Sequence, residues 1–119
     1  KGAKSVTFID NDFVALGIAR ENIVKNNCLE VEHKITSALT KSSKKADYIF
    51  ANILLNPLKK MAKTINSKVK SRGQVFLSGI LIDQVESLLK SYEEHTEKKL
   101  IKIVELHMKQ WACVQITYR

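Results

Sequence analysis

Two polar residues that directly follow short apolar runs are the candidates for chemistry in this sequence. Asp10 follows Val6–Ile9, and Asn52 follows Tyr48–Ala51. Open α/β sheets bind ligands beyond the carboxyl ends of their strands, where a carboxylate can accept both hydroxyls of a ribose. Asn52 stands at the same kind of strand end and is placed to contact a ligand bound there. Two plainer roles stay open: Asp10 as a helix cap, for which Asp12 is better placed, and Asn52 as a turn residue.

The elements that must position these residues alternate along the chain. Apolar residues at helical spacing predict helices over residues 13–26 and 57–70 and a third opened by the Asp83-x-x-Glu86 box. Asn56 before Pro57 predicts a capped start of the second helix. Strands are expected over residues 6–9, 29–35, 48–51, 74–78, 98–108 and 111–118. This pattern predicts a three-layer α/β domain with a mostly parallel sheet.

Two features refine that sheet. The run Tyr48–Ala51 is rich in β-formers and predicts a strand covered on both faces. Lys109–Gln110 is too short for a helical crossover, so the last two strands should form an antiparallel hairpin. A polar, lysine-rich surface loop is expected over residues 36–45.

Composition limits the function classes. The chain has 119 residues and is 45% hydrophobic, which predicts one globular domain. Its net charge is +8, but seventeen of its twenty basic residues are lysines, which favours a solvated surface over phosphate recognition. Cys28 and Cys113 lack metal-type spacing, and His33, His95 and His107 form no ligand motif, so no metal site is predicted. No apolar run is long enough to span a membrane, and we expect a cytoplasmic protein with reduced thiols.

The usual companion of a ribose-binding acid is a glycine-rich loop about twenty residues upstream. Only Gly2 precedes Asp10, and the chain begins with Lys1 directly before a strand-like run. From spacing alone, we therefore expect a nucleotide-type α/β domain whose front end is absent.

Several linked segments resemble the PrmA family, bacterial enzymes that methylate large-subunit ribosomal protein eleven with S-adenosylmethionine. The family's Asn-Ile-Leu-x-x-Pro-Leu segment is present at full spacing, and its Leu-Ser-Gly-Ile-Leu segment is unchanged. The segments that carry the resemblance, in the family's order, are Phe8–Asp12, Ala19–Asn22, Ala51–Leu58, Leu77–Leu81 and Trp111–Cys113.

The resemblance implies a three-layer, Rossmann-like class I S-adenosylmethionine-dependent methyltransferase fold with strand order 3-2-1-4-5-7-6. Val6–Asp10 would be its second strand and Tyr48–Ala51 its fourth. Asp10 would bind the cofactor's ribose, and Asn52 would bind the cofactor beside the transferred methyl group and act in catalysis. The first strand, its glycine loop and a small substrate-recognition domain are missing, so residues 1–119 are expected to be a single partial catalytic domain.

The implied function is methylation of lysine side chains of the ribosomal protein, with its N-terminus as a second candidate acceptor. Two alternatives stay open. One is a related methyltransferase acting on a nucleic-acid or small-molecule amine, although the Asn-x-x-x-Asn-Pro spacing weighs against it. The other is a non-catalytic basic module that binds RNA through its lysines. The chain alone is expected to be inactive and to self-associate through unpaired strand edges.

Overall fold

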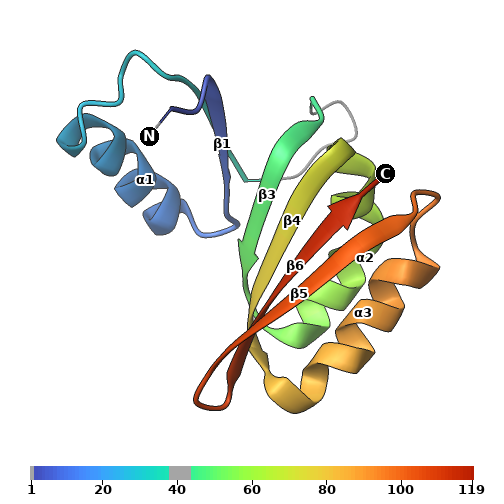
Figure 1. The fold of residues 1–119 in the computed structure, drawn as a ribbon. Coiled ribbons are helices and arrows are strands. Elements are labelled where there is room, and N and C mark those ends of the chain that lie inside the picture. Colours follow the sequence, from blue (N-terminus) through green and yellow to red (C-terminus); the bar gives the residue numbers. More distant parts are fainter. Residues whose placement is uncertain (1, 38–43) are drawn as a thin grey trace. The chain divides into compact units, whose positions relative to one another are not determined.

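The computed structural model describes residues 2–37 and 44–119 (Figure 1). They form two compact units, Lys1–Ser43 and Lys44–Arg119. Whether residues 1–119 form part of a single catalytic domain stays a prediction. Most of the expected lysine-rich loop lies outside the described residues, although Thr36 belongs to a strand. No helix in the described ranges is both long and apolar enough to cross a membrane.

The first unit contains a parallel strand pair and one helix. Strand β1 spans Ser5–Ile9, helix α1 spans Phe13–Lys25 and strand β2 spans Glu32–Thr36. The two strands pair from Ser5↔Glu32 to Ile9↔Thr36. The strand predicted from residue 29 begins three residues later because the chain first turns, with the Val31 amide donating to the Cys28 carbonyl.

Helix α1 starts where the sequence predicts, since the Asp12 carboxylate accepts a hydrogen bond from the Val14 amide at 2.8 Å. Its packing is less complete than its apolar spacing suggests. Leu16 and Ile23 are buried, but Val14 and Ile18 are exposed. A two-stranded sheet offers too little apolar surface to cover every apolar side of the helix.

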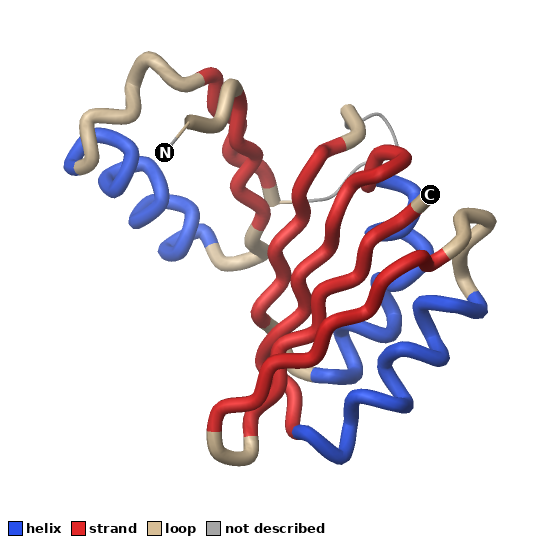
Figure 2. Tube along the Cα trace, viewed as in Figure 1, coloured by secondary structure: helices blue, strands red, loops and turns tan. Residues whose placement is uncertain are grey.

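The second unit is a four-stranded sheet with two helices on one face (Figures 1 and 2). Its elements are β3 (Ala46–Asn52), α2 (Leu55–Lys68), β4 (Val69–Leu81), the short 3₁₀ helix η1 (Ile82–Gln84), α3 (Val85–Glu94), β5 (Leu100–Met108) and β6 (Trp111–Tyr118). The strand order is β3-β4-β6-β5, with β3 and β4 parallel and the other pairs antiparallel. The predicted hairpin of the last two strands is therefore confirmed.

Together the two sheets reproduce both ends of the order 3-2-1-4-5-7-6. Strands β2 and β1 correspond to the third and second positions, and β3-β4-β6-β5 corresponds to 4-5-7-6. In that order, the family's first strand stands between the strands that correspond to β1 and β3. No pairing joins β1 to β3 within the described residues.

The core of the second unit lies between the sheet and the two helices. Strand β6 contributes one face in strict alternation, with Ala112, Val114, Ile116 and Tyr118 all buried, as predicted. Leu58, Ala62 and Ile65 of α2 and Leu88 of α3 pack onto this layer. Burial of these apolar side chains holds the sheet and the helices together. Each of the larger ones contributes about 1.5–3 kcal/mol of stabilisation when fully buried.

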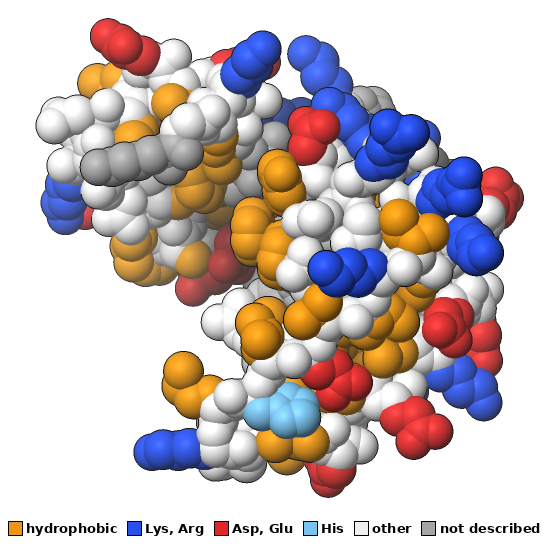
Figure 3. Space-filling model, in the orientation of Figure 1, with side chains coloured by type: hydrophobic (Ala, Val, Ile, Leu, Met, Phe, Trp, Pro, Cys, Tyr) orange, Lys and Arg blue, Asp and Glu red, His pale blue; other side chains and the backbone are white. Residues whose placement is uncertain are grey.

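Within the second unit, the opposite face of this sheet carries apolar side chains that α2 and α3 do not cover (Figure 3). Tyr48 and Phe50 are 61% and 74% exposed. Helices α2 and α3 cover only one face of this strand, so the second unit by itself does not supply the cover predicted for the other face. Phe50 finds partial cover by stacking on Phe76, with 4.8 Å between ring centroids.

Two predicted helix starts are wrong in detail. Helix α2 begins at Leu55 and has Leu54, not Asn56, at its N-cap, without a side-chain cap. Pro57 is accommodated in the first turn because the first four N–H groups of a helix have no partner within it. Helix α3 begins at Val85 and has Gln84, not Asp83, at its N-cap, without a side-chain cap. The Gln84 side-chain oxygen instead accepts from the Leu81 amide at 3.0 Å, at the start of η1.

A buried polar cluster joins the two helices to β6. Asn66 is 3% exposed, and its amide nitrogen donates to the Tyr92 and His95 carbonyls at the end of α3. Its side-chain oxygen accepts from the Tyr118 hydroxyl. Burial raises the pKa of both Tyr92 and Tyr118, and the neighbouring Tyr118 adds to the effect on Tyr92.

Lys98 closes this cluster from the rim. Its ammonium donates to the Asn66 carbonyl at 2.6 Å and to the Val69 carbonyl, and it lies 5.6 Å from the centroid of the Tyr118 ring. Burial, and to a smaller extent the charge of Lys45, lowers the pKa of Lys98. The cluster thus satisfies carbonyl groups at the ends of both helices.

Candidate functional site

Asn52 is the last residue of β3 and lies at the carboxyl end of a parallel strand pair. It pairs with Ser78 of β4, and the Ile53 amide donates to the Ser78 carbonyl at 3.2 Å. The side chain of Asn52 is exposed and makes no hydrogen bond to any described residue. An Asn with only a structural role in a turn would hydrogen-bond its side-chain amide to nearby backbone groups. The Asn52 amide is therefore available to solvent or to a ligand.

Gly79 supports the Asn52 side chain from the next strand. It has a φ of +81°, and a Cβ atom added to it would lie 2.8 Å from the Ile53 carbonyl oxygen and 3.0 Å from Asn52 Oδ1. A larger residue would therefore displace both groups. Sequence analysis identified Gly79 only as part of a motif and as a tight exit from a strand. The pairing of Asn52 with Ser78 reveals its role.

Asp10 directly follows β1, and its backbone amide donates to the Thr36 carbonyl at 3.3 Å, which extends the pairing of β1 with β2. Asp10 Oδ1 accepts from the Asp12 amide at 2.9 Å, while Asp12 caps α1. The capping role considered for Asp10 is thus filled by Asp12. The second carboxylate oxygen of Asp10 makes no hydrogen bond within the described ranges and can accept one from a ligand.

The structure describes the two candidate residues separately, Asp10 in the first unit and Asn52 in the second. Among the described residues there is no group of three or more His, Cys, Asp or Glu that could hold a metal ion. The three histidines are exposed, and Cys28 and Cys113 are free and partly buried.

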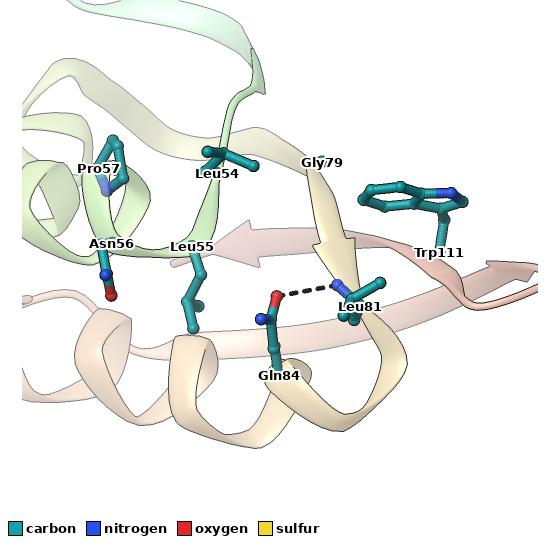
Figure 4. Close-up of a pocket in the computed structure, with 8 residues that line it drawn as sticks. All are labelled: Leu54, Leu55, Asn56, Pro57, Gly79, Leu81, Gln84 and Trp111. Atoms are coloured by element: carbon teal, nitrogen blue, oxygen red, sulfur yellow. Dashed lines mark hydrogen bonds between the residues drawn. The ribbon is translucent and has the colours of Figure 1, made fainter.

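A pocket of about 550 Å³ lies beside Gly79 in the second unit. The connection from β3 into α2 contributes Leu54–Pro57, the end of β4 contributes Gly79 and Leu81, and Gln84 and Trp111 complete the lining (Figure 4). Trp111 entered the sequence analysis only through a family motif. Its presence here could not be read from spacing, because it depends on how the β5–β6 hairpin lies against the end of β4.

Comparison with known proteins decides the family. A family model described as ribosomal protein L11 methyltransferase (PrmA) matches residues 1–119. The chain belongs to this family. The PrmA resemblance found in the sequence is therefore confirmed over the whole chain.

Curated PrmA relatives are similar but much longer. A ribosomal protein L11 methyltransferase from Caldicellulosiruptor saccharolyticus is 34% identical over 114 residues, which are 95% of this chain and 36% of the relative. One from a Shewanella species is 38% identical over 96 residues, covering 78% of this chain and 32% of the relative. The chain thus spans about a third of the length of these relatives.

Solved structures agree on the fold. The crystal structure of a ribosomal protein L11 methylase from Lactobacillus delbrueckii subsp. bulgaricus has a TM-score of 0.83 at 27% identity, covering 99% of this chain and 60% of that one. The strand order of both units fits the same architecture. The chain has the Rossmann-like α/β fold of a class I S-adenosylmethionine-dependent methyltransferase, of which the two units are parts.

Proposed function

We propose that the complete gene product is an S-adenosylmethionine-dependent protein methyltransferase that modifies amino groups of ribosomal protein L11. The match of all 119 residues to the PrmA family model carries this proposal. Lysine side chains are the expected acceptors, and the N-terminal amine is a second one. A ribosomal substrate supports a cytoplasmic location for the enzyme.

Asp10 and Asn52 are the residues that we assign to the cofactor site. Asp10 has a free carboxylate oxygen at the end of β1, which suits hydrogen bonds from ribose hydroxyls. Asn52 has an unused amide at the end of β3, which suits the cofactor's amino group or the incoming amine. Each of these groups is available to a ligand without breaking its own local hydrogen bonds.

S-adenosylmethionine, held through Asp10 and Asn52, would supply the methyl group that the amine nitrogen receives. An amine must be neutral to attack, so the site has to hold the deprotonated form. Asn52 contributes by orientation: an amide that holds the nitrogen in line lowers the barrier without taking part in bond making.

The direct test is mass spectrometry of purified ribosomal protein L11 after incubation with the complete gene product and S-adenosylmethionine. We expect mass increases in steps of one methyl group, located on amino groups by peptide mapping. Ribosomal RNA is the matched alternative substrate, tested at several salt concentrations because incidental contact through surface lysines should weaken with salt. An unmodified protein alongside methylated RNA would overturn the proposal.

Calorimetric titration with S-adenosylmethionine tests the role of Asp10. Losing a charge-assisted hydrogen bond costs about 1.5–3 kcal/mol, so Asp10→Ala should weaken binding roughly 10- to 150-fold. Asp12→Ala is the control, because it removes the cap of α1 and should lower stability by about 0.5–2 kcal/mol without a comparable loss of affinity. Equal affinities for Asp10→Ala and wild type would remove Asp10 from the site.

For Asn52, turnover is the informative quantity. Asn52→Ala should reduce kcat on ribosomal protein L11 by about a hundredfold, as loss of alignment at a reacting centre does. A variant with unchanged kcat would show that Asn52 has no part in the reaction.

A further inference from the structure

The positive charge of the chain is concentrated in the second unit. Residues 44–119 carry fourteen of the twenty Lys and Arg but only seven of the twelve Asp and Glu, so this unit holds seven of the eight net positive charges. Charge spread evenly over a surface keeps a protein soluble, whereas charge gathered on one face attracts a partner of opposite sign. The placement of these side chains therefore bears on function.

Four segments of the second unit meet at the end of the sheet where β3 and β4 begin (Figure 1). Ala46, at the start of β3, pairs with Val69 at the start of β4. The Lys98 ammonium, from the segment before β5, donates to the Val69 carbonyl. The Arg119 amide, just after β6, donates to the Lys99 carbonyl at 2.9 Å. These contacts bring the basic residues of all four segments to one end of the unit.

Exposed basic side chains gather on these segments, and we call the following set the basic end: Lys45, Lys70, Arg72, Lys99, Lys102 and Arg119. Figure 3 shows Lys and Arg side chains gathered at the upper right of this unit, where these segments lie. Burial lowers the pKa of Lys98, and the charge of Lys45 adds to the effect, which places these two ammonium groups near each other.

The acids near the basic end leave most of its charge unpaired. Asp47 forms a salt bridge with Lys70. Glu93 and Glu94 close α3 and Glu97 follows it, but none of these three forms a salt bridge with a described residue. Apart from Lys70, the side chains of the basic end make no hydrogen bond or salt bridge to a described residue. They are available to an anionic partner.

The candidate site lies at the other end of the same strands. Asn52 is the last residue of β3, whereas Lys45 directly precedes the first. A strand of seven residues spans roughly 20 Å. The pocket beside Gly79 has no ionisable side chain among its lining residues. A polyanion held at the basic end therefore leaves the candidate site open to other ligands.

We propose that the basic end binds the phosphate backbone of RNA without reading its sequence. Phosphates follow one another along a strand, so one RNA segment can meet several of these cations at once. Arg72 and Arg119 add planar donor forks that match phosphate oxygens. The choice of RNA over an acidic protein rests on the function proposed above, because a ribosomal protein works bound to RNA. RNA held here is a partner and not a substrate, because the basic end lies away from Asn52.

The test measures binding of the complete gene product to a mixed-sequence, single-stranded RNA oligonucleotide by fluorescence anisotropy, between about 50 and 200 mM salt. The combined variant Arg72→Gln, Lys99→Gln, Arg119→Gln removes three exposed cations of the basic end. It should weaken binding at least about tenfold at the lowest salt concentration. It should also reduce the slope of log K against log salt by about 2, because each contact with a single-strand phosphate contributes about 0.7.

The matched control is the combined variant Lys60→Gln, Lys63→Gln, Lys90→Gln. These lysines are exposed on α2 and α3 outside the basic end, and their loss changes the net charge by the same amount. This variant should keep the RNA affinity within about twofold and leave the salt slope unchanged. An RNA of unrelated sequence should bind within about twofold of the first, and polyglutamate, as a model of an acidic protein, should bind at least about tenfold more weakly.

The outcomes separate this inference from the proposed methyl transfer. A wild-type protein that binds RNA but leaves ribosomal protein L11 unmodified would overturn the proposed function alone. Equal losses of RNA affinity in the two variants would reduce the effect to net charge and overturn the basic end as a site. So would a wild type without RNA affinity, a strong sequence preference, or polyglutamate bound as tightly as RNA.

Methylation of ribosomal protein L11 provides a further readout. The basic-end variant should keep the kcat and KM of the wild type on the free protein, and a raised KM would show that the basic end contacts the protein substrate instead of RNA. If the combined variant lowers the melting temperature, Lys99→Gln with Lys102→Gln decides, because both side chains are exposed and neither bonds to a described residue.

Discussion

Replacing Gly79 with alanine should damage the fold and the proposed chemistry together. Gly79 adopts a φ of +81°, where a residue with a Cβ atom is strained by about 1–2 kcal/mol. The added methyl group would also lie 2.8 Å from the Ile53 carbonyl oxygen, which belongs to backbone and cannot rotate away. Relieving such overpacking costs a further 1–3 kcal/mol or so.

The combined loss of about 2–5 kcal/mol is a large part of the 5–15 kcal/mol that typically separates a folded domain from its unfolded chain. The methyl group would also lie 3.0 Å from Asn52 Oδ1 and push that side chain out of place. Since misplacement by about 1 Å can cost a hundredfold in rate, we expect kcat to fall by more than the loss of folded protein explains.

Thermal unfolding and methyl transfer by the complete gene product measure the two effects. Gly17→Ala is the matched control, because Gly17 lies within α1 and has no atom within 4 Å of its Cβ position. Alanine there should stabilise the helix by about 0.5–1 kcal/mol. A Gly79→Ala variant with the melting temperature and kcat of the wild type would refute this account of Asn52 and its support.

Three further predictions concern the second unit and the chain as a whole. Because burial raises the pKa of Tyr92 and Tyr118 above 10.0, their contribution to the free energy of unfolding is complete below pH 10 and is lost as the pH rises beyond it. Denaturant titrations on either side of pH 10 should show this fall in the free energy of unfolding, and the fall should be smaller in Tyr118→Phe. The lowered pKa of Lys98 has the opposite effect, because it raises the free energy of unfolding as the pH increases up to 10.5. Asn66→Ala should lower the free energy of unfolding by about 3 kcal/mol or more, measured in urea, because it leaves buried partners without hydrogen bonds. Residues 1–119 expressed alone should not methylate ribosomal protein L11 and should not stay monomeric in light scattering. The reason is that β1 and β3 each have only one pairing partner among the described strands, which leaves one edge of each strand open. A monomeric, active fragment would contradict this prediction.

The sequence was most informative where one residue pattern admits one structure. Alternation along residues 111–118 has period two and names the buried face of β6, and the two-residue Lys109–Gln110 connection permits only an antiparallel return. It was less informative at helix starts. Pro57 is tolerated at several positions of a first turn, so Asn56-Pro57 indicated a helix without fixing its first residue.

The candidate site divides in the same way. Asp10 and Asn52 were identifiable because each follows an apolar run, and strand ends are where α/β folds bind ligands. Gly79 and Trp111 became interpretable only through contacts between elements distant in sequence: Asn52 beside Ser78 in the sheet, and Trp111 beside the end of β4. Such contacts depend on strand register and hairpin placement, which the spacing of residues along the chain does not encode.

The exposed face of β3 shows why an apolar pattern predicts burial but not its cause. Tyr48 and Phe50 alternate with the partly buried Ile49 and Ala51, so the strand is apolar on both sides. Helices α2 and α3 cover the side of Ile49, while Phe50 has only the stacked ring of Phe76. A run of β-forming residues reports which surfaces avoid water; it does not report which element covers them. For this strand the sequence predicted a second covering layer that the helices of the second unit do not supply. The exposed apolar face and the unpaired edge of β3 are therefore surfaces suited to association.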